Sequence, residues 1–179
     1  MSIRLSCWKN IGFVVLDQVL SWGLESCKAD TLLVVERKSI DGRGRESFEP
    51  GVKSAVDSLF RKNIRTCLTA RCWPGTELIK STARLYVINF DEAVKNRMVN
   101  AEAELFNWRN VSPKHLPEDI CLLRDGYLYP FFASTTHEGD AYIVTDNTDK
   151  REVPAGFQES NRTIEQLMLA WDGPYCCQL

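Results

Sequence analysis

The segment LPEDICLLRDGYLYPFFASTTHEGDAYIV, residues 116–144, carries the densest β-strand signal in the sequence. Three apolar, β-branched or aromatic runs within it have strand length, namely 120–124, 127–133 and 141–145. The dipeptide Asp125-Gly126 favours a tight turn after the first run, and the polar loop 136–140 precedes the last. Pro130 favours an edge position or a bulge for the middle run. The segment therefore predicts a three-stranded meander.

Patterns of helix and strand surround this meander. Apolar residues recur at helical spacing in four segments, which are 10–25, 51–63, 91–108 and a C-terminal stretch ending at 171. Short β-branched runs predict strands at 31–38, 64–73, 83–90 and 151–153. Asp91 is expected to cap the third helix, and the glycine-containing charged segment 39–50 is expected to be a loop. Val14 and Val15 leave a strand open as an alternative for the first part of 10–25.

These patterns predict one α+β domain over residues 1–179. We expect a mixed, mostly antiparallel sheet formed by 31–38, 83–90 and the C-terminal meander, with helices packed mainly on one face.

The overall composition is that of a globular protein, with 44% hydrophobic and 26% charged residues. The 22 basic and 24 acidic residues give a net charge of -2, which argues against an extended nucleic-acid-binding surface. The most apolar run, near 11–24, contains Asp17 and Gln18 and is too short to span a bilayer. The N-terminal MSIRLSCWKN has no apolar core of a secretory signal. These features predict a cytoplasmic protein without a membrane segment.

Seven cysteines and two histidines give no metal-binding pattern, because no Cys-x-x-Cys pair is present. We therefore expect no structural zinc and no cofactor, with most thiols reduced and buried as small apolar groups. The last residues, Cys176-Cys177-Gln178-Leu179, have the outline of a prenylation signal, but a frayed tail is the preferred interpretation.

Glu36-Arg37-Lys38, at the end of a predicted strand, is the sharpest catalytic candidate. Metal-dependent nucleases of the restriction-endonuclease-like class place a Glu-x-Lys there, with the carboxylate on a divalent cation and the lysine near the attacking water. Such a site needs a second, upstream acid, which would have to be Asp17 or Asp30. The preferred interpretation is a charged strand end at the surface.

His137 lies in the loop Thr-His-Glu-Gly-Asp, next to acids that could raise its pKa or share a metal with it. A cysteine hydrolase would need one thiol paired with a histidine, and no local signature selects one of the seven cysteines. A solvated loop is the preferred interpretation. The loops at the ends of the meander carry four acids that could present a negative surface to a basic protein partner, namely Glu138, Asp140, Asp146 and Asp149.

The C-terminal third contains, in order, Phe131-Phe132, Gly139-Asp140, Tyr142, Asp146, Val153 and the helical pattern 164–171. This order of features resembles the SUKH superfamily. Many members of that superfamily are small cytoplasmic immunity proteins of bacteria, so the resemblance implies a non-enzymatic binder of a partner toxin. The resulting hypothesis is an immunity-type inhibitor that occludes a toxin's active site through Glu138, Asp140, Asp146 and Asp149. The alternative hypothesis is the nuclease that uses Glu36 and Lys38.

Overall fold

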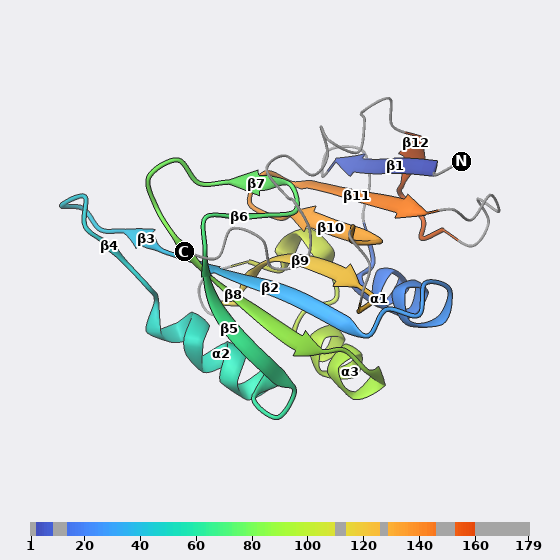
Figure 1. The fold of residues 1–179 in the computed structure, drawn as a ribbon, viewed down its shortest axis with the longest axis horizontal. Coiled ribbons are helices and arrows are strands. Elements are labelled where there is room, and N and C mark those ends of the chain that lie inside the picture. The colour runs from blue at the N-terminus through green and yellow to red at the C-terminus, as the bar shows by residue number, and fades with distance from the viewer. Residues whose placement is uncertain (1–2, 9–13, 110–113, 126–128, 146–152, 160–179) are drawn as a thin grey trace.

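An eight-stranded antiparallel sheet forms the centre of the computed structural model (Figure 1). The structure describes residues 3–8, 14–109, 114–125, 129–145 and 153–159. The strand order is β12-β1-β11-β10-β9-β2-β8-β5. The strands are β1 Ile3–Trp8, β2 Thr31–Arg37, β5 Ile64–Ala70, β8 Ala83–Asn89, β9 Glu118–Leu123, β10 Phe132–Thr135, β11 Asp140–Thr145 and β12 Gln158–Glu159. Every pairing between them is antiparallel.

The predicted α+β class, with a mostly antiparallel sheet and a C-terminal meander, is confirmed: β9, β10 and β11 follow one another in both sequence and space. β2 lies between β8 and β9 and is buried from Thr31 through Glu36. Leu32 and Val34 face one apolar cluster, and Leu33 and Val35 face another. Because both faces are covered, β2 has a continuous apolar run instead of an alternating pattern.

The helices pack on one face of the sheet, as predicted. They are α1 Leu16–Glu25, α2 Pro50–Phe60 and α3 Glu92–Ala101. Their apolar stripes meet Leu32, Val34 and Ile88 of the sheet in one buried cluster. No helix in the described part of the chain is long and apolar enough to cross a membrane.

Helix α3 begins as predicted but ends early. Asp91 caps it, since the Val94 backbone N–H donates to its Oδ1 over 2.7 Å. The predicted extent to residue 108 is wrong, because Glu102 is already extended and Glu104 forms a β-bridge with Val15. A short 3-10 turn, η1 Leu105–Asn107, follows.

Two small hairpins extend from the sheet. One consists of β3 Ser39–Ile40 and β4 Glu46–Ser47, and lies in the segment predicted to be a plain loop. Its turn is closed by Asp41, whose Oδ1 accepts the N–H groups of Arg43 and Arg45. The other consists of β6 Cys72–Trp73 and β7 Thr76–Glu77, so the strand predicted at 64–73 is interrupted after Ala70.

Several other predictions differ from the structure or lie outside its described part. Strand β1 was not predicted; it pairs with β11 and β12. The connection between β9 and β10 runs from 124 to 131 and is no two-residue turn. Val153 lies in a bend, and the last described strand is β12. Gly126, the start of the first predicted helix and the C-terminal helix lie outside the described residues.

The cysteines differ in state. Cys72 is disulfide-bonded, whereas Cys27, Cys67 and Cys121 are free thiols. Cys27 and Cys121 are buried, as expected for small apolar groups, and Cys67 is exposed on β5.

Candidate functional site

One end of the sheet carries two hairpins and a loop with charged and exposed apolar side chains. Arg37 pairs with Ala83, which pairs with Ala70, so the ends of β2 and β5 meet the start of β8. Glu118, at the start of β9, and the turn between β10 and β11 lie at this same end. The hairpins β3–β4 and β6–β7 and the loop from β7 to β8 project from it, on the left of Figure 1. We call it the loop end of the sheet.

Asp119 is the centre of a buried polar cluster at the loop end. It lies in a β-bulge, where the register between β2 and β9 shifts, and has a φ of +47°. Its side chain is fully buried. The Trp73 indole N–H donates to Oδ2 over 2.8 Å, and the Thr136 backbone N–H donates to Oδ1 over 2.7 Å. The carboxylate thereby fastens the β6–β7 hairpin and the β10–β11 turn to the sheet.

His137 extends this cluster to the surface. Its Nδ1 lies 3.4 Å from Asp119 Oδ1, and its Nε2 lies 3.6 Å from Glu138 Oε1. Burial alone would lower the pKa of His137, but the hydrogen bond and charge of Asp119 outweigh it and raise that pKa above its usual value. The two carboxylates therefore favour the protonated form of the imidazole.

Glu118, next to Asp119 in the chain, is a second titratable group with a perturbed pKa at this place. Burial raises the pKa of the Glu118 carboxyl, and the neighbouring charge of Asp119 adds to the rise. Arg37, whose Nε is 3.9 Å from Glu118 Oε2, opposes it. Perturbed pKa values occur at catalytic sites and in structural networks alike. The contacts of the His137 imidazole among the described residues are to the carboxylates of Asp119 and Glu138, and the Thr136 hydroxyl binds Asp119 instead.

The four acids predicted to form a docking rim do not share one environment. Glu138 lies at the tip of the β10–β11 turn with its side chain 64% exposed. Asp140 begins β11 opposite Thr135 and is buried. Its side chain is therefore not exposed to a partner, in contrast to the prediction. Asp146 and Asp149 lie outside the described residues.

The predicted nuclease pair, Glu36 and Lys38, is divided between two sets of contacts. Glu36 is buried, and its Oε2 accepts the Tyr86 hydroxyl over 2.6 Å and the Arg84 guanidinium over 3.2 Å. Lys38 pairs instead with Glu46, at 3.5 Å. A cation held by Glu36 would have to compete with Arg84 for the same carboxylate.

Neither upstream acid reaches this place. Asp30 precedes β2 at the end opposite Glu36, about 17–20 Å away at the usual rise per residue. Asp17 lies on α1, where it pairs with Lys95 at 3.6 Å. The described residues contain no group of three or more metal-ligating side chains of the His, Cys, Asp and Glu types. The acid pair that the nuclease hypothesis required is therefore not assembled from these residues.

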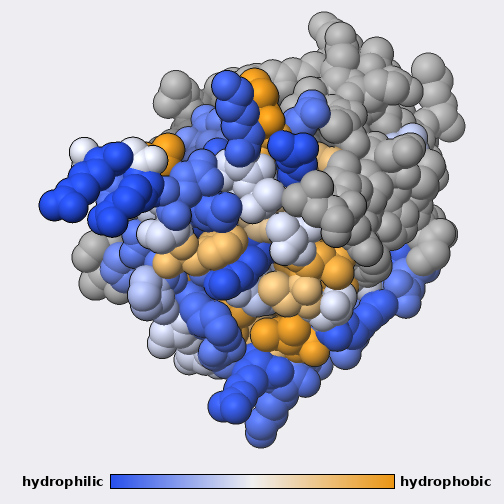
Figure 2. All heavy atoms as spheres, turned by 60° about the vertical axis from the view of Figure 1, so that its left-hand side comes forward, coloured by the Kyte–Doolittle hydropathy of each residue, from blue (hydrophilic) through white to orange (hydrophobic). Residues whose placement is uncertain are grey.

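Exposed aliphatic side chains at the loop end were missed in the sequence. Ile40 is 70% exposed on β3, and Ile79 is 86% exposed in the loop from β7 to β8. The two segments are joined, because Glu46, opposite Ile40 in the hairpin, accepts a hydrogen bond from the Ser81 hydroxyl over 2.7 Å. Figure 2 turns this end forward and shows separate hydrophobic areas on a largely hydrophilic face. The signal available in the sequence was a lone isoleucine in each of two polar loops.

Phe48, which follows β4, packs against two basic side chains at the loop end. The Arg84 guanidinium carbon lies 3.9 Å from the centre of the Phe48 ring, and Lys38 Nζ lies 5.7 Å from it. Arg84 in turn binds the buried Glu36, so the hairpin is linked to the sheet through a stacked cation. We call the two isoleucines with Lys38, Glu46 and Ser81 the Ile40–Ile79 surface.

No family model, curated protein or solved structure matches this chain.

Proposed function

We propose that the protein is a protein-binding module that docks through the loop end of its sheet. The observation that carries the proposal is the joint exposure of Ile40 and Ile79 on two segments linked by Ser81 and Glu46. Among the residues whose side-chain exposure the structure describes, the other exposed large hydrophobic residue is Tyr129, at 37%. Interfaces commonly bury a few apolar anchors inside a polar rim.

Each of these two side chains can contribute substantially to a binding energy. Burying one exposed isoleucine is worth about 1.5–3 kcal/mol. Loss of one anchor should therefore weaken binding by about tenfold to a hundredfold. Because both side chains are already solvent-exposed in the free protein, their replacement should leave its stability nearly unchanged.

Charges at the same end would orient the partner. Lys38, Glu46 and Arg45 lie on the β3–β4 side, and the exposed Glu138 lies on the β10–β11 turn. Rim charges of both signs favour specificity and association rate more than affinity. Glu138 thus keeps the docking role predicted for the acidic loops.

The more specific form of this proposal is an immunity-type inhibitor that acts in the cytoplasm and occludes the active site of a toxin. The resemblance of the C-terminal third to the SUKH superfamily supports that form. A toxin with an apolar patch beside its basic substrate-binding groups would fit the Ile40–Ile79 surface and Glu138 together.

Co-expression with the product of the adjacent gene tests the proposal. We expect growth rescue from a toxic neighbour and a complex measurable by calorimetry, which Ile79→Asp and Ile40→Asp should each weaken by about tenfold or more. Tyr129→Asp is the matched control, because Tyr129 is an exposed aromatic in the 124–131 connection at the opposite end of the sheet. Binding that is absent, or that both isoleucine variants leave unchanged, would contradict the proposal.

A further inference from the structure

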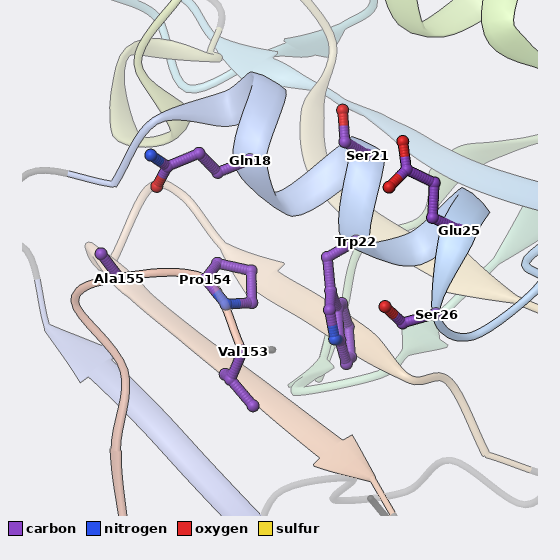
Figure 3. A pocket seen from close by; sticks show the side chains of 8 residues that line it. All are labelled: Gln18, Ser21, Trp22, Glu25, Ser26, Val153, Pro154 and Ala155. Atoms are coloured by element: carbon purple, nitrogen blue, oxygen red, sulfur yellow. The ribbon is translucent and has the colours of Figure 1, made fainter. Parts of the chain in front are cut away.

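Helix α1 and the segment 153–155 line an open pocket of about 440 Å³ (Figure 3). Its helix side is formed by Gln18, Ser21, Trp22 and Glu25, and its other side is apolar and includes Pro154. The volume lies in the range of sites that hold small metabolites. In Figure 1, α1 lies on the right, away from the hairpins of the loop end, so this pocket is separate from the proposed docking surface.

Trp22 supplies the feature that points to a ligand. The residue is only 5% exposed, and its indole Nε1 is buried without a hydrogen-bond acceptor. Figure 3 shows the indole ring hanging from α1 into the pocket wall, with its nitrogen on the side of Val153 and Pro154. Buried donors in folded proteins nearly always have partners. An acceptor that entered from the pocket would satisfy this N–H group once the side chains that cover the nitrogen shift slightly to admit it.

The charged groups in and beside the pocket argue against an anionic ligand. Lys95 reaches the Ser21 hydroxyl over 3.1 Å, but two acids already hold it, Asp17 at 3.6 Å and Glu92 at 2.6 Å. Arg124 donates to the Cys27 carbonyl just beyond α1. The charge of Lys95 is thus balanced beside the pocket, and Glu25 is the one charged residue among the described residues that line it, so a strongly anionic ligand would be disfavoured there.

The hydrogen-bonding groups are mixed. The Trp22 N–H can only donate, the ionised Glu25 carboxylate can only accept, and the Gln18 amide can do both. Glu25 is exposed at the rim and forms no ion pair with another described residue. A ligand that fits must offer donors and acceptors together, and hydroxyl groups do so at a single atom.

We propose that this pocket binds a neutral polyhydroxyl ligand of monosaccharide size. One ligand oxygen accepts the Trp22 indole N–H, a second hydroxyl donates to Glu25, and the C–H face of the ring lies against Val153 and Pro154. Docking of a partner at the loop end is not required for this binding.

Titration of the ¹⁵N-labelled protein with the methyl glycosides of glucose, galactose and mannose, followed by the indole N–H resonances, tests the proposal. The Trp22 resonance is identified by its loss in Trp22→Phe. We expect at least one glycoside to shift it saturably. Trp108, whose indole nitrogen is also buried without an acceptor, is the internal control and should not shift. Glu25→Gln should weaken the binding about fivefold or more, since it replaces a charge-assisted hydrogen bond.

Cyclohexanol, which has a similar ring and one hydroxyl, should bind more weakly than the best glycoside. The proposal is overturned if none of the three glycosides shifts the Trp22 resonance, if cyclohexanol shifts it equally well, or if Glu25→Gln has no effect on the apparent Kd. Glu25 is exposed, so this variant is expected to fold even if Trp22→Phe does not.

Discussion

Replacement of Asp119 should cost the protein a large part of its stability, although the residue forms no ion pair with arginine or lysine in the described structure. In Asp119→Ala, the Trp73 indole N–H and the Thr136 backbone N–H lose their acceptors at a fully buried place. Each buried donor left unsatisfied costs about 1–3 kcal/mol. Alanine also adopts the φ of +47° found here less readily than aspartate does, and this backbone strain adds roughly 1–2 kcal/mol. We therefore expect a loss of about 3 kcal/mol or more.

Asp119→Asn separates these contributions. Asparagine tolerates a positive φ and keeps one carbonyl acceptor, but it presents an amide N–H₂ group to either Trp73 or Thr136. Its cost should be about 1–3 kcal/mol. Glu138→Gln, at the exposed tip of the neighbouring turn, is the control and should stay within about 0.5 kcal/mol of the wild type.

Urea unfolding monitored by tryptophan fluorescence gives these differences directly. Hydrogen exchange of the Trp73 indole N–H adds a local measurement, because Asp119→Ala should release the β6–β7 hairpin and speed this exchange. If Asp119→Ala loses less than about 1 kcal/mol, or if the Trp73 indole exchanges as in the wild type, the cluster does not fasten the hairpin as we infer.

Three further measurements check other parts of the structure. The pKa of His137 is raised in the folded state, so the stabilisation by its protonated form is complete below the unfolded-state pKa and declines as pH rises through the folded-state pKa. His137→Gln should therefore lose more stability at pH 5 than at pH 8. An equal loss at both pH values in urea unfolding would contradict this. Asp91→Ala removes the cap of α3 and should cost about 0.5–2 kcal/mol in the same assay, whereas Glu104→Ala, outside that helix, should not show a capping loss. Burial raises the pKa of Cys27 to about 12, so this thiol should resist iodoacetamide at pH 8 until the protein is unfolded. Rapid labelling of Cys27 in the native protein, located by mass spectrometry, would refute its burial.

The features predicted correctly from the sequence depend on residues close together in the chain. The strand Thr31–Arg37 follows from an unbroken β-branched and apolar run, and the helix Pro50–Phe60 follows from a periodic stripe behind a proline. The cap at Asp91 acts on Val94, three residues away, so its chemistry was visible in a short window. The order of these elements was enough to indicate an α+β fold.

Contacts between distant residues decided the rest. In the sequence, Asp119 is an ordinary charged residue between Glu118 and Ile120. It becomes buried because β2 pairs with β9 and the β6–β7 hairpin packs against it. Its partner Trp73 is 46 residues away. A buried carboxylate is stable only where such donors converge on it, and a local sequence pattern carries no information about that convergence.

The same reason explains Glu36 and helix α3. Glu36 was expected at a charged surface, but the register of β2 against β8 places Tyr86 and Arg84 beside it and buries it. Helical periodicity continued past Ala101, yet pairing of Glu104 with Val15 ended the helix. The sequence by itself determined the central strands β2, β8 and β9 and the cores of the three helices, because propensity and periodicity are local. The tertiary structure alone decided which acids are buried and which isoleucines are exposed, because burial depends on the segments that pack against each side chain.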